Sequence, residues 1–269
     1  MGTLILEAYG QLAPGTNLIN PEEEDLYSVF RARAGLMGWS TTSGGRSLLW
    51  GMNEAELTAG SVPSLIGYVQ VGLEVGDVER TEVPPPAPGL AYAPLGVRRR
   101  PIEPAKVLPA LVQCFDDALR RFGDVELSAL QVAAYGLDPS TRLPAHYLDS
   151  ELNWFNLTPK GGADALIAFD HGLLGGHTEA ELAARLRRGN TRSFEFGQVA
   201  AVSEQHAIRT SIDERILSVS PTRSGLGVTV KMPEWTASAV GWVLAAVIDT
   251  ARDIAPDVSG FAVRVTRVG

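Results

Sequence analysis

The chain has 269 residues, of which 45% are hydrophobic and 20% are charged, a composition typical of a globular protein with an ordinary core. Its formal net charge of −8 argues against a general binder of nucleic acid or anionic membranes, because phosphate binding needs an excess of Lys and Arg. We therefore expect neither a nucleic-acid partner nor a membrane partner.

The N-terminus has no basic segment and no long apolar run, so we expect no signal peptide. The most apolar stretch, residues 237–248, is too short to cross a membrane. These features favour a soluble cytoplasmic protein and leave homo-oligomerisation open.

Cys114 is the only cysteine, so the chain can form neither an intrachain disulfide nor a zinc–thiolate site. The thiol lies beside Phe115 in an amphipathic segment, which favours a buried and unreactive side chain. The chain contains no nucleotide-binding, zinc-protease, serine-hydrolase or thiol-redox motif. We expect no cofactor and no metal, while an enzyme whose acids and bases come from separate strands would leave no local motif.

In the first half, apolar and polar residues alternate in the segments expected to be strands. Asn20 and Pro21 predict a helix start, and Gly35 predicts its end. A second helix is expected to begin at Pro109. The expected order is strand, helix, strand, strand, helix, strand, over residues 3–9, 20–34, 47–52, 68–75, 109–122 and 125–135.

The second half repeats this order. Thr178 and Glu181 form a capping box, which predicts a helix that Gly189 and Asn190 end. Pro233 and Pro256 bracket a second helix. The expected elements are strand, helix, strand, strand, helix, strand, over residues 163–171, 178–188, 193–202, 226–232, 233–255 and 261–265.

Each half thus has the order of a split β-α-β, ferredoxin-like unit. The predicted fold is α/β (α+β), with two tandem units that form a pseudo-symmetric α/β sandwich or barrel. Residues 1–137 would form the first unit, residues 138–160 a packed linker and residues 161–269 the second unit. A single larger mixed sheet built from the same elements is the alternative.

A sheet of this kind has one face under its helices and one bare face. The residues expected on the bare face are mixed in character: Ile5, Glu7, Tyr9, Tyr68, Gln70, Gln131 and Tyr135 in the first half, and Asp170, Glu195, Thr229, Lys231, Arg264 and Thr266 in the second. They suit a ligand with an aromatic or apolar body and an anionic end, bound between the sheets. The alternative is cross-strand pairing without a ligand.

Asp170, His171 and His177 flank a glycine-rich turn. Two His and one Asp within eight residues could ligate a metal or form an acid–base site, and Asp170 and His171 are the candidates for the acid–base role. His177 follows six residues after His171, a spacing that does not place both rings on one helix face. The glycines of residues 172–176 could cradle an anion through their backbone amides, but a tight turn into the next helix is the simpler interpretation.

Three hypotheses for the function remain. The first is a non-catalytic protein that holds a small ligand or a protein partner at the sheet faces, with Tyr9, Tyr68, Gln131, Lys231 and Arg264 as the ligand-binding residues. The second is a cofactor-independent enzyme acting on an aromatic or anionic metabolite through Tyr9, Tyr68, Asp170, His171, Lys231 and Arg264. The third is an assembly protein with an apolar patch near Trp39, Trp50, Trp154 or residues 84–88.

Overall fold

The computed structural model of the protein shows a mixed α/β architecture. The described residues are 3–14, 25–36, 46–49, 64–72, 74–78, 97–101, 104–135, 155, 162–170, 177–189, 193–203, 206–208, 226–258 and 260–268.

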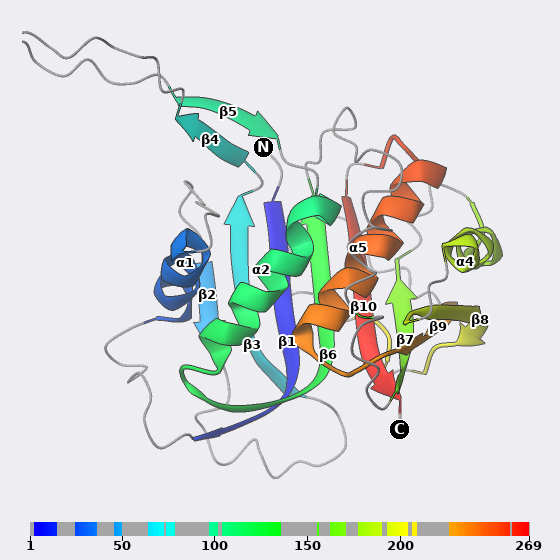
Figure 1. The fold of residues 1–269 in the computed structure, drawn as a ribbon, viewed down its shortest axis with the longest axis horizontal. Coiled ribbons are helices and arrows are strands. Elements are labelled where there is room, and N and C mark those ends of the chain that lie inside the picture. The colour runs from blue at the N-terminus through cyan, green and yellow to red at the C-terminus, as the bar shows by residue number, and fades with distance from the viewer. Residues whose placement is uncertain are drawn as a thin grey trace, which may run out of the picture.

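An eight-stranded sheet forms the body of the molecule, in the order β2-β3-β1-β6-β10-β7-β9-β8 (Figure 1). Every neighbouring pair is antiparallel. Its strands are β1 (Thr3–Pro14), β2 (Arg46–Leu49), β3 (Ser64–Gly72), β6 (Gly123–Tyr135), β7 (Ala163–Phe169), β8 (Glu195–Ala201), β9 (Leu226–Met232) and β10 (Gly260–Val268). A separate two-stranded sheet consists of β4 (Glu74–Val78) and β5 (Val97–Pro101).

The described helices lie together on one face of the eight-stranded sheet (Figure 1). They are α1 (Leu26–Leu36), α2 (Pro104–Leu119), α4 (Glu179–Arg188) and α5 (Ala237–Ile254). The main core lies between these helices and the sheet, and it includes Phe30, Phe115, Phe169 and Phe194. None of the described helices has the length and apolar character needed to span a membrane.

The sheet is open, with β2 at one edge and β8 at the other. The described strands therefore do not close into the barrel that was one of the two expected packings, and the two halves do not form separate sheets packed face to face. Instead β6 of the first half pairs with β10 of the second half, so one sheet runs through both. Hydrogen bonds along this seam make the halves a single layer, which is why the sheet has only two edges.

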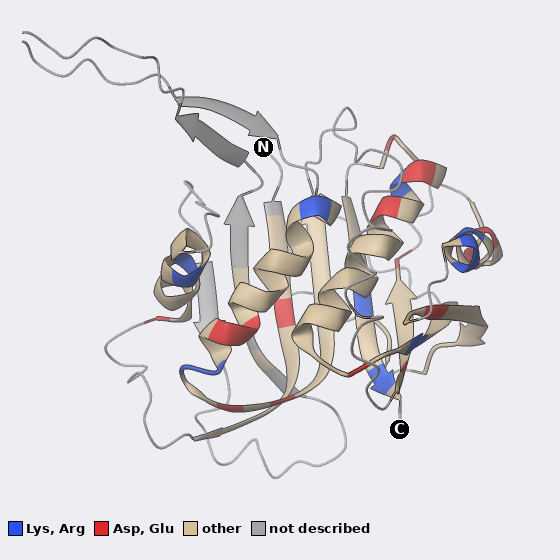
Figure 2. Cartoon of the chain, in the orientation of Figure 1, with Lys and Arg blue, Asp and Glu red and all other residues tan. Residues whose placement is uncertain are grey.

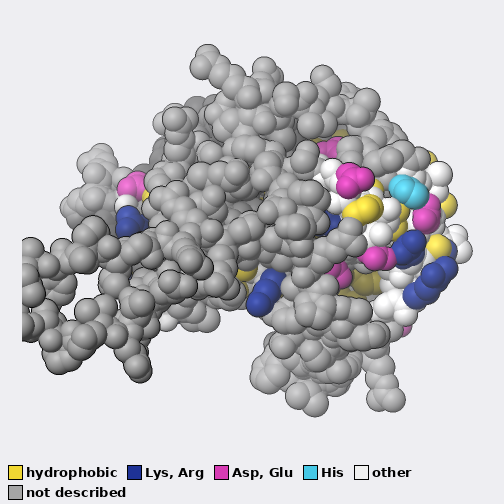
Figure 3. Space-filling model, turned by 90° about the horizontal axis from the view of Figure 1, so that it is seen from above, with side chains coloured by type: hydrophobic (Ala, Val, Ile, Leu, Met, Phe, Trp, Pro, Cys, Tyr) yellow, Lys and Arg dark blue, Asp and Glu magenta, His cyan; other side chains and the backbone are white. Residues whose placement is uncertain are grey.

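Charged residues lie mainly on the helices and at the ends of the strands (Figure 2). One acidic band interrupts the middle of β1, a strand whose only acidic residue is Glu7. On the described part of the outer surface, acidic and basic side chains lie next to one another (Figure 3). Glu7 thus places a charge in the centre of the sheet, where the other described residues are mostly uncharged.

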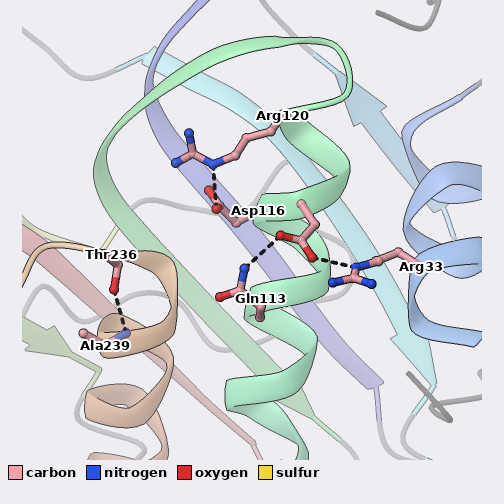
Figure 4. A network of polar contacts seen from close by, with 7 residues as sticks. Arg33, Gln113, Asp116, Arg120, Thr236 and Ala239 are labelled. Carbon is pink, nitrogen blue, oxygen red and sulfur yellow. Dashed lines mark hydrogen bonds and ion pairs between the residues drawn. The ribbon is translucent and has the colours of Figure 1, made fainter. Parts of the chain in front are cut away.

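One helix start in the second half, the capping box of α4, is confirmed in detail. The Thr178 hydroxyl accepts a hydrogen bond from the backbone N–H of Glu181, 3.2 Å away, as the capping box predicts. The other start was predicted wrongly: α5 begins at Ala237 rather than at Pro233, because the Thr236 hydroxyl caps it by accepting from the N–H of Ala239 at 3.2 Å (Figure 4). Gly189 ends α4, as predicted. Local side-chain chemistry therefore sets these ends without help from the rest of the fold.

One helix start in the first half was predicted wrongly, and the other prediction lies outside the described residues. α1 begins at Leu26, where Asp25 caps it by accepting from the Ser28 N–H at 3.0 Å, whereas the start predicted at Asn20 and Pro21 falls outside the part of the chain that the structure describes. α2 begins at Pro104, and Pro109 lies inside it. Proline suits the first turn of a helix because that turn has unpaired N–H groups, and Pro104 takes this place. Pro109 removes one further bond but packs against α5.

Polar contacts tie α1 to α2. The Arg33 guanidinium donates from Nε to Asp117 Oδ2 at 2.6 Å, and Gln113 Nε2 donates to Asp117 Oδ1 at 2.8 Å. Arg120 bonds Asp116 one turn away at 2.8 Å (Figure 4). These pairs are partly exposed, so we expect each to contribute at most about 1 kcal/mol.

The linker expected over residues 138–160 lies outside the described residues except for Phe155. Its ring is buried and packs edge-to-face on Phe194, with 5.1 Å between the ring centroids. At this position the chain is anchored to the second half.

The close approach of α2 and α5 depends on Gly241. A Cβ at this position would lie 3.0 Å from Pro109 Cα and 3.3 Å from Val112 Cβ. We expect Gly241→Ala to lower the free energy of unfolding by about 1–3 kcal/mol, because the two helices must move apart. Urea denaturation measures the change. Gly189→Ala is the control, since its nearest neighbour would be an ordinary 3.5 Å away; equal effects of the two substitutions would contradict the close-packing argument.

Candidate functional site

The helix-free face of the sheet carries a group of polar residues that are buried. Leu6 on β1, Val132 on β6 and Val263 on β10 belong to the core under the helices. Their neighbours therefore point to the opposite face. On that face Glu7 is 1% exposed, and Gln131 and Arg264 are 0% exposed. Burying such groups is costly unless they are hydrogen-bonded or paired, so their arrangement needs a physical reason.

Three parallel rows cross the seam where the two halves meet. The register of β1 with β6 and of β6 with β10 sets these rows. Ile5, Ala133 and Ala262 form an apolar row; Glu7, Gln131 and Arg264 form a polar row; Tyr9, Ala129 and Thr266 form the third. None of the nine is more than 4% exposed. We call these nine residues the seam site.

Glu7 is held by two donors. Tyr9 Oη donates to Glu7 Oε2 at 3.0 Å, and Gln131 Nε2 donates to the same oxygen at 2.6 Å. Two hydrogen bonds to one oxygen favour the ionised carboxylate, since that form accepts hydrogen bonds only. The geometry therefore suits an anionic Glu7 in the middle of the sheet.

Arg264 belongs to the second half but contacts a residue of the first. Its guanidinium carbon lies 4.0 Å from the centre of the Tyr9 ring, a cation–π arrangement. Its Nε donates to Thr266 Oγ1 at 3.3 Å. Tyr9 thus touches both charged residues of the polar row, through its hydroxyl at Glu7 and through its ring at Arg264.

A short segment of the second half, residues 206–208, lies against this face. Ile208 packs on the apolar row of Ile5, Ala133 and Ala262. The pKa of His206 is lowered from its ordinary value of 6.5. Burial is the larger cause, and the positive charge of Arg264 adds to it. Imidazole near the cation is therefore favoured in its neutral form.

The structure brings together three of the five predicted ligand-binding residues: Tyr9, Gln131 and Arg264. Lys231 lies two strands from Arg264, on β9, and its side chain is exposed. The backbone of Tyr68 pairs with Glu7, and its side chain lies outside the described residues. The binding role of all five remains a prediction.

Of the two residues named for acid–base chemistry, the structure describes only Asp170. Asp170, at the end of β7, is buried and accepts from the Ala262 N–H through Oδ2 at 2.8 Å, which is a structural bond between strands. His171 and the glycines that follow it lie outside the described residues. Among the residues of the enzyme hypothesis, Tyr9 and Arg264 are in contact.

The features of the other hypotheses lie elsewhere. His177 Nδ1 lies 2.9 Å from Glu181 Oε2, so the histidine pairs within its own helix start. Among the described residues no three of His, Cys, Asp and Glu are grouped so that they could hold a metal ion. The tryptophans and prolines of the assembly hypothesis lie outside the described residues. The exposed large hydrophobic residues that are described lie on three different elements: Leu36, Leu226 and Val268.

Cys114 lies in the core under the helices and is 1% exposed. Burial raises the pKa of its thiol above 9.0, against an opposing effect of Arg33 and with a smaller raising effect of Asp117. The thiol therefore lacks the exposed cationic setting of a nucleophile.

Sequence reasoning placed Glu7 on the right face but left it out of the ligand-binding set, although it forms the centre of the hydrogen bonds. The segment around His206 was missed altogether. Its residues are polar and without a period, so nothing local indicates that Ile208 would meet the sheet.

Comparison with protein-family models, with curated proteins and with solved structures found no match to this chain.

Proposed function

We propose that the chain is a binding protein that holds a small molecule at the seam site. The ligand would have an apolar body for the row of Ile5, Ala133 and Ala262, and a polar or anionic end for the row that contains Arg264. The observation that carries this proposal is the adjacency of the two rows: apolar and charged residues lie two positions apart on the same three strands, all of them buried. Sites for small ligands combine an apolar lining with few polar groups in this way.

The burial of the seam site favours a small molecule over a protein partner. A docking protein needs an exposed patch of several hundred Å². The nine residues of the seam site are instead covered by the chain itself, in part by Ile208. A cytoplasmic location and a homo-oligomer remain predictions beside this function.

We also propose that the fold is duplicated, with one ferredoxin-like unit in each half. Its support is the strand order. The first half reads β2-β3-β1-β6, and the second half, read from its outer edge, reads β8-β9-β7-β10. In both halves the first strand lies between the third and the fourth, and the fourth meets its counterpart at the seam. The ligand would therefore bind where the two units join, as ligands commonly do between domains.

Native mass spectrometry of the protein purified from its own host, before and after denaturing extraction, tests the proposal. We expect a bound small molecule that is absent after extraction. Arg264→Lys keeps the charge but loses the planar fork of donors, and should lose at least about tenfold in affinity for the released compound. Arg267→Lys, on the same strand but exposed, is the matched control.

A protein that carries no small molecule, and whose melting temperature does not change with any compound of a broad metabolite panel, would contradict the proposal. Equal loss of affinity in the two variants would place the ligand outside the seam site. Both variants should fold, because lysine at position 264 preserves the buried charge; circular dichroism checks this.

A further inference from the structure

We propose that Ser128 and Trp235 are positioning residues of the seam site, which hold the strand junction beside Tyr9. They thereby aim the Tyr9 side chain at the two charged residues of the polar row. This inference deepens the proposed function and rests on it, because the site that the two residues shape is the proposed ligand site. Neither belongs to the nine residues of the seam site, and neither was predicted to bind a ligand.

The register of β1 changes beside Tyr9 against both of its neighbouring strands. On β6, Ser128 is the additional residue between the partners of Tyr9 and Gly10. On β3, Ile66 is the additional residue between the partners of Ala8 and Tyr9. Such an insertion disrupts the ladder locally and re-aims the side chains next to it. Regular strand pairing alone therefore does not fix the direction of the Tyr9 side chain.

Ser128 is tied directly to the backbone that carries the Tyr9 ring. Its hydroxyl donates to the Tyr9 carbonyl at 2.9 Å. Gly10 allows the two strands to come this close, since a Cβ on Gly10 would lie 3.0 Å from the Ser128 backbone nitrogen. A shift of the additional residue of β6 therefore moves the Tyr9 backbone with it.

Trp235 holds the same junction from the second half of the chain. Its indole Nε1 donates at 2.6 Å to the carbonyl of Leu127, the residue before Ser128. Trp235 lies just before the Thr236 cap of α5, and its side chain packs against the core under the helices. Two consecutive residues of β6 are thus fixed, one by the start of α5 and the other by β1.

Two contacts of the Tyr9 side chain depend on where the ring lies. Its Oη donates to Glu7 Oε2 at 3.0 Å, and its ring centre lies 4.0 Å from the guanidinium carbon of Arg264. A hydrogen bond is lost beyond about 3.5 Å, and a cation–π contact beyond about 6 Å. Since Glu7 and Arg264 belong to different halves, the position of the Tyr9 ring decides whether one side chain joins them.

Fluorine NMR of the protein labelled with 3-fluorotyrosine reports the surroundings of the Tyr9 ring without any ligand. The chain has six tyrosines, and the resonance that disappears in Tyr9→Phe is that of Tyr9. We expect Ser128→Ala to shift this resonance by more than its linewidth, because the hydroxyl bond is lost. Trp235→Phe, which keeps an aromatic ring but loses the N–H donor, should also shift it. The resonance of Tyr27 on α1, assigned in the same way, should stay in place in both variants.

Each variant has a matched control. Thr229→Ala removes a hydroxyl that donates to the Gln198 carbonyl at 3.4 Å, beside the register shift of β8 against β9. Trp242→Phe changes a second tryptophan that packs against the same core. Neither control should move the Tyr9 resonance, because neither residue contacts the junction of β1 with β6 in the way that Ser128 and Trp235 do.

A double-mutant cycle on the unfolding equilibrium tests the link by a second measurement. Tyr9→Phe keeps the ring and removes the bond of the hydroxyl to Glu7. Its effect on the unfolding equilibrium constant should be smaller by at least about twofold in the Ser128→Ala background than in the wild-type protein. In the Thr229→Ala background its effect should be the same as in the wild type.

A Tyr9 resonance that stays in place in Ser128→Ala or in Trp235→Phe would overturn the role of that residue, and so would an equal shift in its control. Additive effects in the cycle would also overturn the role of Ser128. Circular dichroism checks that every variant is folded. No ligand is used, so a negative result leaves binding at the seam site standing, and a protein without a bound molecule leaves the positioning of Tyr9 standing.

Discussion

The Gly10→Ala substitution is expected to lower the free energy of unfolding by about 3–5 kcal/mol, the largest effect of any single methyl group in the described part of the chain. Gly10 has a φ of 148°, a conformation that side chains rarely adopt. A Cβ there would lie 2.0 Å from the Glu126 carbonyl oxygen, far inside contact distance. The register of β1 against β6 shifts between Tyr9 and Gly10, so the glycine forms a β-bulge in the strand that carries Glu7 and Tyr9.

Urea denaturation monitored by circular dichroism measures this loss. Gly35→Ala is the control, because its added methyl group would meet no described atom within 4 Å apart from its chain neighbours and the backbone of α1, in which the residue lies. We expect this substitution to be neutral or to stabilise by up to about 1 kcal/mol. If Gly10→Ala destabilises by less than about 1 kcal/mol, the bulge is not a required feature of β1.

The second large effect is expected from Arg264→Met, which should lower the free energy of unfolding by about 3–5 kcal/mol. Methionine fills much of the same space, so the loss is mainly electrostatic. Arg264 and Glu7 are both fully buried and lie on either side of Gln131 in one row. Removing the cation leaves the carboxylate buried without it, and it also removes the contact with the Tyr9 ring.

A double-mutant cycle separates these contributions. Glu7→Gln in the Arg264→Met background should cost at least about 1 kcal/mol less than in the wild-type protein, because the neutral amide no longer needs a cation nearby. Arg267→Met, at the exposed end of the same strand, should change stability by no more than about 0.5 kcal/mol. Additive effects of the two buried substitutions would show that Glu7 and Arg264 do not depend on each other.

The candidate site was predictable in part. The alternation of polar and apolar residues in β1, β6 and β10 correctly predicts that Glu7, Gln131 and Arg264 share the helix-free face, since the period of a strand is a local property. It does not predict that the three lie in one row. That depends on the pairing of β6 with β10, whose residues are more than a hundred positions apart.

The sequence by itself determined the order of the described helices and of the strands in the eight-stranded sheet, the cap at Thr178, and the faces that β1, β6 and β10 present to the helices. All of these arise from neighbours within a few residues, so their physical cause is written locally. Only the tertiary structure decided the bulge at Gly10, the place of Pro109 inside α2, the open sheet and the position of Ile208 on the seam site. Each of these depends on contacts between distant segments, where packing and hydrogen bonding outweigh local preference.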